Sequence, residues 1–276
     1  FRSLPANSQE SHALRIMREE TLHQIPGLDS EGGVVRLFLM EELVKPHTLP
    51  NWAVLMAGGE GKRMHPLTKN CPKPMLKVGG KPILEIILEQ CVDSGFRKFF
   101  ISVYHLKEQI MKYFGNGDHW GVEIQYLVEE QPLGTAGALG LFSQFPEQEI
   151  LVINGDVLSR IDHVKLLQFH KVNKSSATIC VREHQTEVPF GVVKTNGSEL
   201  VSLEEKPVLT HNINAGIYVL NPEIIRLLQL DQMCDMPQLL ERGLERNLTI
   251  QAFPVHEYWA DVGKPSKYEQ VNGEWK

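Results

Sequence analysis

The sequence predicts an α/β domain whose mixed, mostly parallel sheet is flanked by helices, preceded by a small α+β segment. Two observations predict the main domain. From Trp52 onward, apolar runs of β type alternate with amphipathic stretches, which is typical of a parallel sheet with helical crossovers. The pair Asn196-Gly197 joins two strand-like runs, so part of the second half is expected to be an antiparallel hairpin.

The main domain is expected to alternate strands and helices along its length. Strands are predicted at residues 52–57, 98–103, 122–127, 149–154, 176–181, 189–195, 213–220 and 248–254. Helices are predicted at residues 81–94, 105–114, 134–145, 161–173 and 235–246. In the first of these helices, Ile83, Ile86 and Ile87 fall at helical spacing. Gly95 then supplies a stop signal.

The first part of the chain follows another pattern. Residues 1–46 are expected to form a helix, a strand, a glycine turn, a second strand and a short helix, and residues 11–21 show helical apolar spacing. Residues 47–51 are predicted to be a linker, and residues 52–276 form the main domain. Because the chain starts with Phe1, we expect further residues to precede it in the native protein.

Composition narrows the class of function. With 276 residues and 42% hydrophobic content, the chain is long enough for a substantial core. A formal net charge of −6 argues against a nucleic-acid-binding surface. Neither a membrane-spanning apolar run nor a leader pattern is present, so we expect a cytoplasmic protein without a membrane partner. The widely spaced cysteines are expected to be reduced structural thiols: Cys71, Cys91, Cys180 and Cys234.

A glycine-rich loop that ends in cations follows the first predicted strand of the main domain. The glycines within residues 58–61 let backbone N–H groups approach phosphate oxygens, and Lys62, Arg63 and Lys73 supply positive charge. A Walker A loop is excluded because Arg63 stands where Ser or Thr is required. A dinucleotide fingerprint is excluded because Met64 replaces its third glycine. The loop therefore predicts phosphate binding of another kind.

Residues 130–139 form a second segment of interest, with the sequence Glu-Gln-Pro-Leu-Gly-Thr-Ala-Gly-Ala-Leu. Its small side chains leave room for a flat group such as a nucleobase. A helix whose small residues pack closely on the sheet explains the same pattern, so both interpretations stay open at this point.

Two carboxylates follow apolar strands. Asp156 ends the run Ile-Leu-Val-Ile-Asn-Gly-Asp, and Asp261 lies in Trp-Ala-Asp-Val-Gly. Ligands of open α/β sheets lie beyond the carboxyl ends of strands, and Mg²⁺ takes one or two protein carboxylates together with phosphate oxygens. The pair is a candidate magnesium site. Taken singly, each is also explained as an ordinary turn residue.

Three further segments combine a polar group with a glycine or proline: residues 189–193, 204–207 and 214–218. Carboxylate and amide groups can orient sugar hydroxyls, and a lysine can bind a sugar phosphate. Individually, such groups are more often surface charges or strand bulges.

Seven motifs follow one another along the chain: Gly-Gly-x-Gly-x-Arg, Lys-Pro, Leu-Gly-Thr-Ala, Asn-Gly-Asp, Glu-Glu-Lys-Pro, Asn-Ala-Gly and Trp-x-Asp-x-Gly. Together and in this order, they resemble the sugar-1-phosphate nucleotidyltransferases, also called nucleotide-sugar pyrophosphorylases. The resemblance covers residues 52–271. It implies the nucleotide-diphospho-sugar transferase fold, which is Rossmann-like. It also implies transfer of a nucleoside monophosphate from an NTP to a sugar 1-phosphate with release of pyrophosphate, in the presence of Mg²⁺. A homo-oligomer is compatible with this family, and bacterial surface-sugar biosynthesis is the expected setting.

The resemblance assigns roles to particular residues. It implies that Arg63 and Lys73 act on the phosphates and that Asp156 and Asp261 hold Mg²⁺, which makes these four the expected catalytic residues. The residues expected to bind the nucleotide are Ala57, Gly58, Gly59, Gly61, Gln131, Gly134 and Thr135. The residues expected to bind the sugar phosphate are Gly191, Glu205, Lys206, Asn214 and Gly216, with Glu204 as the alternative to Glu205.

The identity of the base follows from the same resemblance. The sequence Leu-Gly-Thr-Ala-Gly at residues 133–137 is most similar to guanylyltransferases that act on mannose or glucosamine 1-phosphate, which favours GTP. A thymidylyl- or uridylyltransferase of the same fold is the alternative. Residues 1–46 resemble the second half of a CBS domain, so a non-catalytic nucleotide sensor is the rival function from another class. An acyltransferase-linked enzyme is disfavoured, since the chain ends at Lys276 before any hexapeptide repeat.

Overall fold

The computed structural model of the chain describes residues 2–43 and 48–275, apart from the side chains of residues 11, 41 and 42. Two compact units divide the chain, Phe1–His47 and Thr48–Lys276. The predicted boundary at Pro46 and the first residue of the predicted linker lie outside the described residues. In the ranges that are described, helices of the length and apolarity needed to cross a membrane are absent.

The first unit is a three-stranded sheet with two helices. Its elements are β1 (Leu4–Pro5), α1 (Glu10–Glu19), β2 (Gln24–Leu28), β3 (Val34–Leu39) and α2 (Met40–Leu43). The predicted order of helix, strand, turn, strand and short helix is confirmed, with β1 added at the start beside β2. Ala13, Ile16 and Met17 share one face of α1 and pack on Ile25 and Phe38, which makes a small core of its own.

A seven-stranded sheet forms the centre of the second unit. Its strands, in spatial order, are β15 (Ile250–Pro254), β11 (Ala177–Glu187), β14 (Val208–Leu220), β9 (Ile150–Asn154), β4 (Leu49–Met56), β7 (Phe96–Val103) and β8 (Glu123–Val128). β14 runs antiparallel to both of its neighbours, and the other adjacent pairs are parallel. The predicted mixed, mostly parallel sheet is therefore confirmed.

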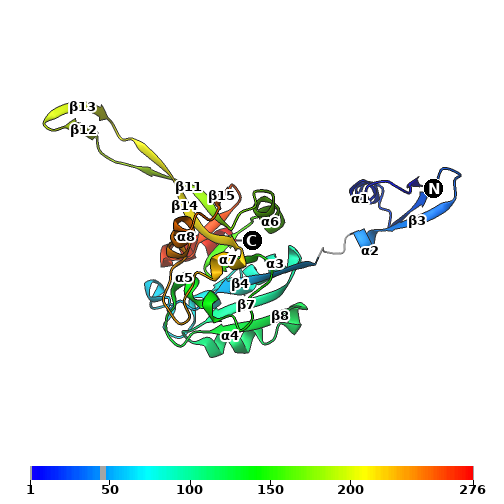
Figure 1. The fold of residues 1–276 in the computed structure, drawn as a ribbon, viewed down its shortest axis with the longest axis horizontal. Coiled ribbons are helices and arrows are strands. Elements are labelled where there is room, and N and C mark those ends of the chain that lie inside the picture. The colour runs from blue at the N-terminus through cyan, green and yellow to red at the C-terminus, as the bar shows by residue number, and fades with distance from the viewer. Residues whose placement is uncertain (1, 44–47, 276) are drawn as a thin grey trace. The chain divides into compact units, whose positions relative to one another are not determined.

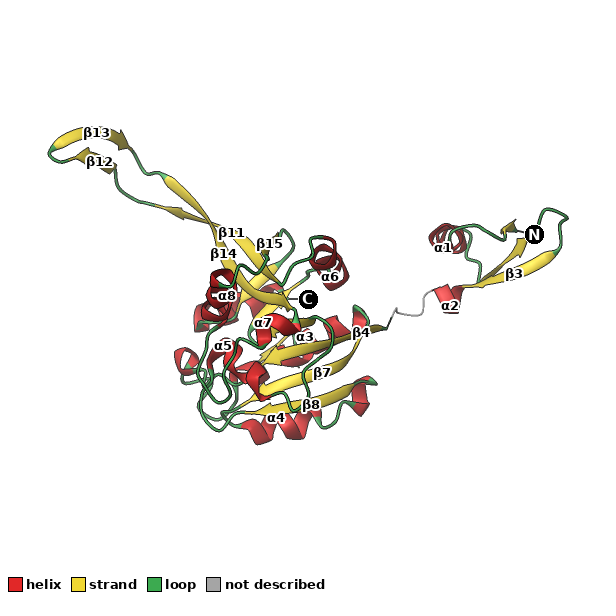
Figure 2. Ribbon diagram, viewed as in Figure 1, coloured by secondary structure: helices red, strands yellow, loops and turns green. Residues whose placement is uncertain are grey.

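Helices cover both faces of this sheet (Figure 2). They are α3 (Ile83–Asp93), α4 (Lys107–Phe114), α5 (Gly134–Gly137), α6 (His163–Val172), α7 (Pro222–Ile225), α8 (Met236–Glu245) and α9 (Pro265–Glu274). In β4, Ala53 and Leu55 point into the core under α3, α4, α6 and α9, whereas Val54 points into the core under α5, α7 and α8. This alternation is the period of two that a strand buried on both faces requires.

Short elements complete the second unit. The turns of 3₁₀ helix are η1 (Lys62–Met64), η2 (Lys73–Met75), η3 (Asp118–Trp120) and η4 (Ala138–Leu141). Two small antiparallel pairs are β5 (Lys77–Val78) with β6 (Lys81–Pro82), and β10 (Val157–Ser159) with β16 (Trp259–Asp261).

The strands predicted over residues 176–181 and 213–220 are longer in the structure, as β11 and β14, and the strand predicted over residues 189–195 is shifted to residues 192–196. Two further predicted elements differ. β4 begins at Leu49 rather than at residue 52, because Leu49 pairs with Phe96 of β7 and its N–H donates to the backbone O of Gly95 at 2.8 Å. Residues 49–51, predicted to be linker, therefore belong to the sheet. The helix predicted over residues 134–145 is only α5 followed by η4. Gly134 has a φ of +77°, which the interior of an α-helix does not allow. Gly137 lies against the backbone O of Gln232, so this segment packs more closely on neighbouring backbone than a long helix could.

β11 and β14 extend past the sheet as a two-stranded ribbon that ends in a hairpin of β12 (Val192–Asn196) and β13 (Glu199–Glu204) (Figure 1). We call residues 183–212 the arm. The hairpin predicted at Asn196-Gly197 is confirmed, and Gly197 has a φ of +60° in its turn. Nearly every residue of the arm is exposed, so it contributes little to the core of its own unit.

Candidate active site

A cavity of about 720 Å³ lies at the carboxyl ends of β4 and β9 and beside β14. Because β14 is antiparallel to β9, residues in its middle reach the same edge as the carboxyl ends of its neighbours. Twelve of the residues predicted to form the site line this cavity: Ala57, Gly58, Gly59, Gly61, Arg63, Lys73, Gly134, Thr135, Asp156, Asn214, Gly216 and Asp261. The structure thus brings together segments that are far apart in the sequence.

The glycine loop is held in its turn by local contacts. Gly61 has a φ of +65°, and a Cβ there would stand 3.1 Å from side-chain atoms of Lys73 and Thr68, so glycine suits this position. The hydroxyl of Thr68 donates to the backbone O of Gly61 at 2.8 Å. Met64, the last residue of η1, is fully buried and anchors the turn that carries the exposed Arg63.

Glu129 is a cavity residue that sequence reasoning missed. Its side chain is 3% exposed and lies beneath Gly58, and its Oε2 accepts from the N–H of Leu133 at 2.9 Å. Burial raises the pKa of Glu129, against the opposing effects of the Leu133 N–H and the Ser102 hydroxyl. The signal that was available is its position, directly after a strand and directly before the segment of small residues.

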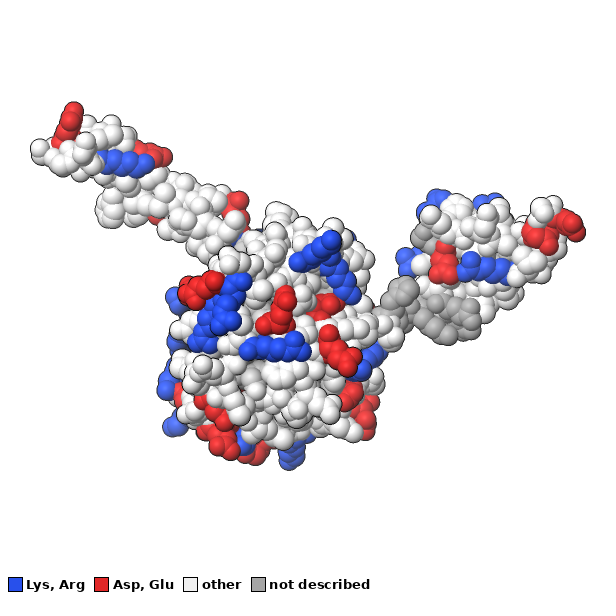
Figure 3. Space-filling model, in the orientation of Figure 1, with Lys and Arg blue, Asp and Glu red and all other residues white. Residues whose placement is uncertain are grey.

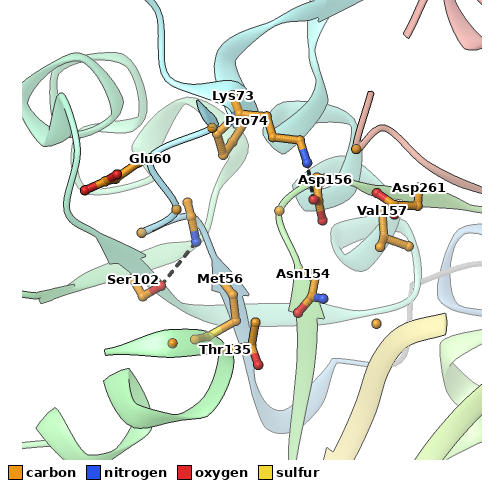
Figure 4. A pocket seen from close by; sticks show the side chains of 18 of the residues that line it. Met56, Glu60, Lys73, Pro74, Ser102, Thr135, Asn154, Asp156, Val157 and Asp261 are labelled. Atoms are coloured by element: carbon orange, nitrogen blue, oxygen red, sulfur yellow. Dashed lines mark hydrogen bonds and ion pairs between the residues drawn. The ribbon is translucent and has the colours of Figure 1, made fainter. Parts of the chain in front are cut away.

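Lys73 and two carboxylates meet on the other side of the cavity (Figure 4). Lys73 is 8% exposed, and its Nζ pairs with Oδ2 of Asp156. Asp261 lies opposite Val157 in the pairing of β10 with β16, and the N–H of Val262 donates to the backbone O of Asp156 at 2.9 Å. The short strand pair therefore fixes both carboxylates next to each other.

The environment of Asp261 includes the charge of Asp156. Burial and then the charge of Asp156 raise the pKa of Asp261, while the cations Lys73, Arg63 and Lys264 lower it. Asp261 is nevertheless exposed at the mouth of the cavity, so it remains accessible to a ligand. No group of three or more His, Cys, Asp or Glu side chains suited to a metal occurs among the described residues, so a metal here would rely on these two.

The segment of small residues is fastened to the start of α8. The backbone N–H and the hydroxyl of Thr135 donate to Oδ1 of Asp235 at 3.0 and 3.3 Å, and the N–H of Met236 donates to the Thr135 hydroxyl at 2.8 Å. A Cβ on Gly134 would stand 2.7 Å from the same Asp235 oxygen. The close packing of this segment on its neighbour is confirmed. The segment also lines the cavity, and its role in binding a nucleobase stays a prediction.

Two of the residues predicted to bind the sugar phosphate, Asn214 and Gly216, lie on β14 and line the cavity. The amide of Asn214 donates to the Tyr218 hydroxyl at 2.6 Å, and its oxygen accepts from the N–H of Gly216 at 2.9 Å. Gly216 has a φ of +71°, and a Cβ there would stand 2.8 Å from Nδ2 of Asn154. Asn214 thus shapes the backbone bulge, while its side chain is already hydrogen-bonded within the protein.

Four predicted residues do not line the cavity. Gln131 is exposed, and its amide donates to the backbone O of Asp231 at 3.1 Å. Gly191, Glu205 and Lys206 belong to the arm, where Glu205 lies beside Gly191. Other cavity residues that were not predicted include Ser102, Asn154, Met233 and Trp259.

The chain is similar to known proteins over the residues that form this cavity. The model of the nucleotidyl transferase family matches residues 52–275. A D-glycero-α-D-manno-heptose 1-phosphate guanylyltransferase of Aneurinibacillus thermoaerophilus is 31% identical over 225 residues, which are 80% of this chain and 97% of that protein. A UTP–glucose-1-phosphate uridylyltransferase of Synechocystis sp. is 32% identical over 79% of this chain and 62% of that protein.

A mannose-1-phosphate guanyltransferase of Yarrowia lipolytica is 32% identical over 78% of this chain and 61% of that protein. The chain therefore spans about three fifths of the length of some curated relatives and nearly all of others. Among solved structures, HddC from Yersinia pseudotuberculosis is 26% identical with a TM-score of 0.65, over 82% of this chain and all of that one. The family model begins at Trp52, so the resemblance of residues 1–46 to part of a CBS domain stays a prediction.

Proposed function

Because the chain belongs to the nucleotidyl transferase family, we propose that it transfers a nucleoside monophosphate from an NTP to a sugar 1-phosphate and releases pyrophosphate. One observation carries the proposal. A single cavity joins the glycine loop at residues 57–63 to Lys73, Asp156 and Asp261, which come from four separate segments of the chain. This arrangement suits two phosphorylated reactants that must be aligned with each other.

In this reaction, an oxygen of the sugar phosphate attacks the α-phosphorus of the NTP. A P–O bond forms there, and the P–O bond to the β-phosphate breaks, so that pyrophosphate leaves with the electron pair. The sugar phosphate is already largely ionised near pH 7, so it needs no general base. Arg63 lies on the loop and lines the cavity, and its proposed role is to stabilise the charge that develops on the leaving group. The proposed role of Lys73 is to offset the repulsion between the two anions.

A divalent cation, with Mg²⁺ as the expected ion, fits Asp156 and Asp261. Two carboxylates that lie on adjacent short strands and line one cavity are suited to a hard cation with oxygen ligands. When bound, such an ion would neutralise charge on the phosphates. Lys73 now pairs with Asp156, so it also holds that carboxylate in place within the protein.

GTP is the favoured nucleotide, and Glu129 supports this choice. Its buried carboxylate lies at the cavity wall beside Gly58 and can only accept hydrogen bonds when ionised. Guanine presents the N1–H and N2–H₂ donors side by side on its Watson–Crick edge, whereas uracil and thymine present one donor between two acceptors. The guanylyltransferases among the relatives support the same nucleotide. Uridylyl or thymidylyl transfer is the alternative.

The cavity itself supplies fewer of the residues proposed to bind the sugar phosphate than of those proposed to bind the nucleotide. Gly216 and the bulge shaped by Asn214 provide room beside Asp156, while Gly191, Glu205 and Lys206 are proposed to act on the sugar phosphate from the arm. Synthesis of nucleotide sugars for a bacterial surface, in the cytoplasm, remains the expected setting.

The test is a pyrophosphate-release assay with GTP, UTP, dTTP, CTP and ATP, each combined with mannose, glucose, glucosamine and heptose 1-phosphates. We expect turnover with at least one pair, and the highest kcat/KM with GTP. If the folded protein shows no turnover with any pair, the proposed enzymatic activity is refuted and a nucleotide sensor is favoured. For the base, Glu129→Gln should lower kcat/KM for GTP at least tenfold more than for UTP, since it replaces an acceptor by a donor.

A further inference from the structure

The loop between α7 and α8 presents two apolar side chains to solvent. Leu230 and Met233 are 68% and 66% exposed. The two differ in one respect, since Met233 lines the cavity described above and Leu230 does not. A single exposed apolar residue is ordinary on a protein surface. The position of Met233 at the wall of a ligand cavity is what sets it apart.

Hydrogen bonds on both sides of Met233 hold this loop against the segment of small residues. On one side, the amide of Gln131 donates to the backbone O of Asp231 at 3.1 Å. On the other side, the N–H of Cys234 donates to the backbone O of Leu133 at 2.9 Å. The backbone of Met233 lies between these two fixed points, so its side chain is kept at the cavity.

Two glycines of the small-residue segment make this close approach possible. A Cβ on Gly134 would stand 2.8 Å from the backbone O of Cys234, and a Cβ on Gly137 would stand 2.7 Å from the backbone O of Gln232. A side chain at either position would push the loop outward. The glycines therefore have a consequence for the cavity, because they let the loop place Met233 in its wall.

We propose that Met233 covers one face of the nucleobase of the bound NTP. This rests on the proposed function. Of the groups in the two reactants, only the base has a flat apolar face, whereas the phosphates are anionic and the sugars carry hydroxyls. A methionine side chain is flexible and polarisable, and its sulfur makes favourable contacts with aromatic rings. Pro132, Gly134 and Thr135, from the segment that holds the loop, line the same cavity.

Other occupants suit this wall less well than the base does. Phosphate groups are suited to Lys73 and to a cation held by Asp156, and Figure 4 shows both residues well apart from Thr135. Lys and Arg side chains are intermixed with Asp and Glu side chains over the visible face of the second unit (Figure 3). Neither sign predominates on that face, so it does not favour a charged macromolecule as the ligand.

A contact with the face of the base predicts a kinetic pattern that differs from that of Glu129. Every base has a π face, so stacking does not depend on which base is bound, whereas hydrogen bonds to the base edge do. Met233→Ala should therefore raise KM by about fivefold to twentyfold for each NTP that the protein uses, by a similar factor for all of them. The kcat should stay within about twofold of the wild type, because the contact is equal in the ground state and the transition state.

Two further variants control this measurement. Met233→Leu keeps an apolar side chain of similar size and should stay within about threefold of the wild-type KM. Leu230→Ala removes the other exposed apolar side chain of the same loop, outside the cavity, and should leave KM within about twofold. Equal effects of Met233→Ala and Leu230→Ala on KM would overturn the proposal.

Methyl NMR of the wild type tests the contact without any turnover. The chain has eight methionines, so labelling their methyl groups with ¹³C gives few signals, and the spectrum of Met233→Leu identifies the one from Met233. With Mg²⁺ and GTP, we expect this signal to move upfield, because the ring current of the base shields a methyl group over its face. Inorganic tripolyphosphate, which lacks a base, should leave it in place. An equal shift with tripolyphosphate, a shift with a sugar 1-phosphate alone, or no shift with any NTP would refute the contact.

The two experiments separate this contact from the proposed reaction. If the wild type shows no turnover with any substrate pair but the Met233 signal moves with GTP, the reaction fails and the nucleobase contact stands. If the wild type turns over while neither KM nor the signal depends on Met233, the reaction stands and the base lies elsewhere in the cavity.

Discussion

The carboxylate of Glu129 lies directly beneath the backbone of Gly58, so close that a Cβ on Gly58 would overlap Oε1. The carboxylate cannot move aside without leaving the N–H of Leu133. Gly58→Ala should therefore lower the free energy of unfolding by about 1–3 kcal/mol, as overpacking does. Gly59→Ala is the matched control, since a Cβ there meets nothing within 4 Å, and it should change stability by less than about 0.5 kcal/mol. Denaturant unfolding of the two variants checks this, and equal losses would contradict it.

The raised pKa of Glu129 predicts how its removal affects stability with pH. Burial favours the protonated carboxyl in the folded state, so the folded protein binds that proton more tightly than the unfolded chain does. Stability is then lost as pH rises from the ordinary glutamate pKa of 4.5 through the raised value. Glu129→Gln should gain stability relative to the wild type as pH rises through this window. Parallel curves of unfolding free energy against pH for the two proteins would refute the prediction.

Lys73 and Lys62 should differ sharply as catalytic groups, although both line the cavity. Lys73 is buried and held by Asp156, whereas Lys62 is exposed and pairs with Glu60. Lys73→Met should reduce kcat by about 10²–10³, the size of loss seen when a preorganised electrostatic group is removed. Lys62→Met should stay within about threefold of the wild type. Steady-state kinetics at saturating NTP decides, and similar effects from both substitutions would contradict the assignment.

Asp235 should couple the stability of α8 to nucleotide binding. Its Oδ1 accepts both hydrogen bonds from Thr135 at the cavity wall. Asp235→Ala should cost about 1 kcal/mol of stability, as loss of a residue at a helix start does, and should raise KM for the NTP. Glu241→Ala, an exposed position on the same helix, should change neither quantity. A stability loss without any change in KM would show that Thr135 does not depend on this contact.

The loss of folding stability at acid pH should depend on His163. Burial lowers the pKa of this histidine from 6.5 to about 4, and its Nδ1 lies 3.0 Å from the Ser94 hydroxyl. Its neutral form is favoured in the folded state, so stability present above pH 6.5 is lost as pH falls toward 4, by at most about 3 kcal/mol. His163→Gln should flatten that part of the stability curve. An unchanged acid slope in the variant would contradict this.

Much of the fold could be predicted because it depends on local sequence patterns. The same holds for the part of the site that the glycine loop and the two aspartates form. Buried strands with apolar runs, and the glycines and carboxylates that follow them, show in the sequence wherever the chain reaches the edge of a parallel sheet. The structure places Asp156 and Asp261 together for that reason, although 105 positions separate them.

The remainder depended on pairings that local patterns do not encode. In the sequence, nothing distinguishes Glu129 from the other charged residues. Only the fold shows that it lies beneath Gly58. Asn214 has the residue type of a sugar ligand, but its amide is used inside the protein by Tyr218 and Gly216. The arm arises because the β11–β14 ladder continues to Glu187 and Val208, and the mixed polar and apolar sequence of its exposed residues carries no signal of where that ladder ends.

The way the arm joins the sheet also makes it a separable module. Both of its ends leave the sheet side by side, from strands that stay paired with each other at Arg182 and Ile213. A graft that replaced residues 183–212 by a short turn, or by the hairpin of a relative, would leave every other strand pair of the sheet untouched. The arm can therefore change in length and sequence without a change in any residue that lines the cavity.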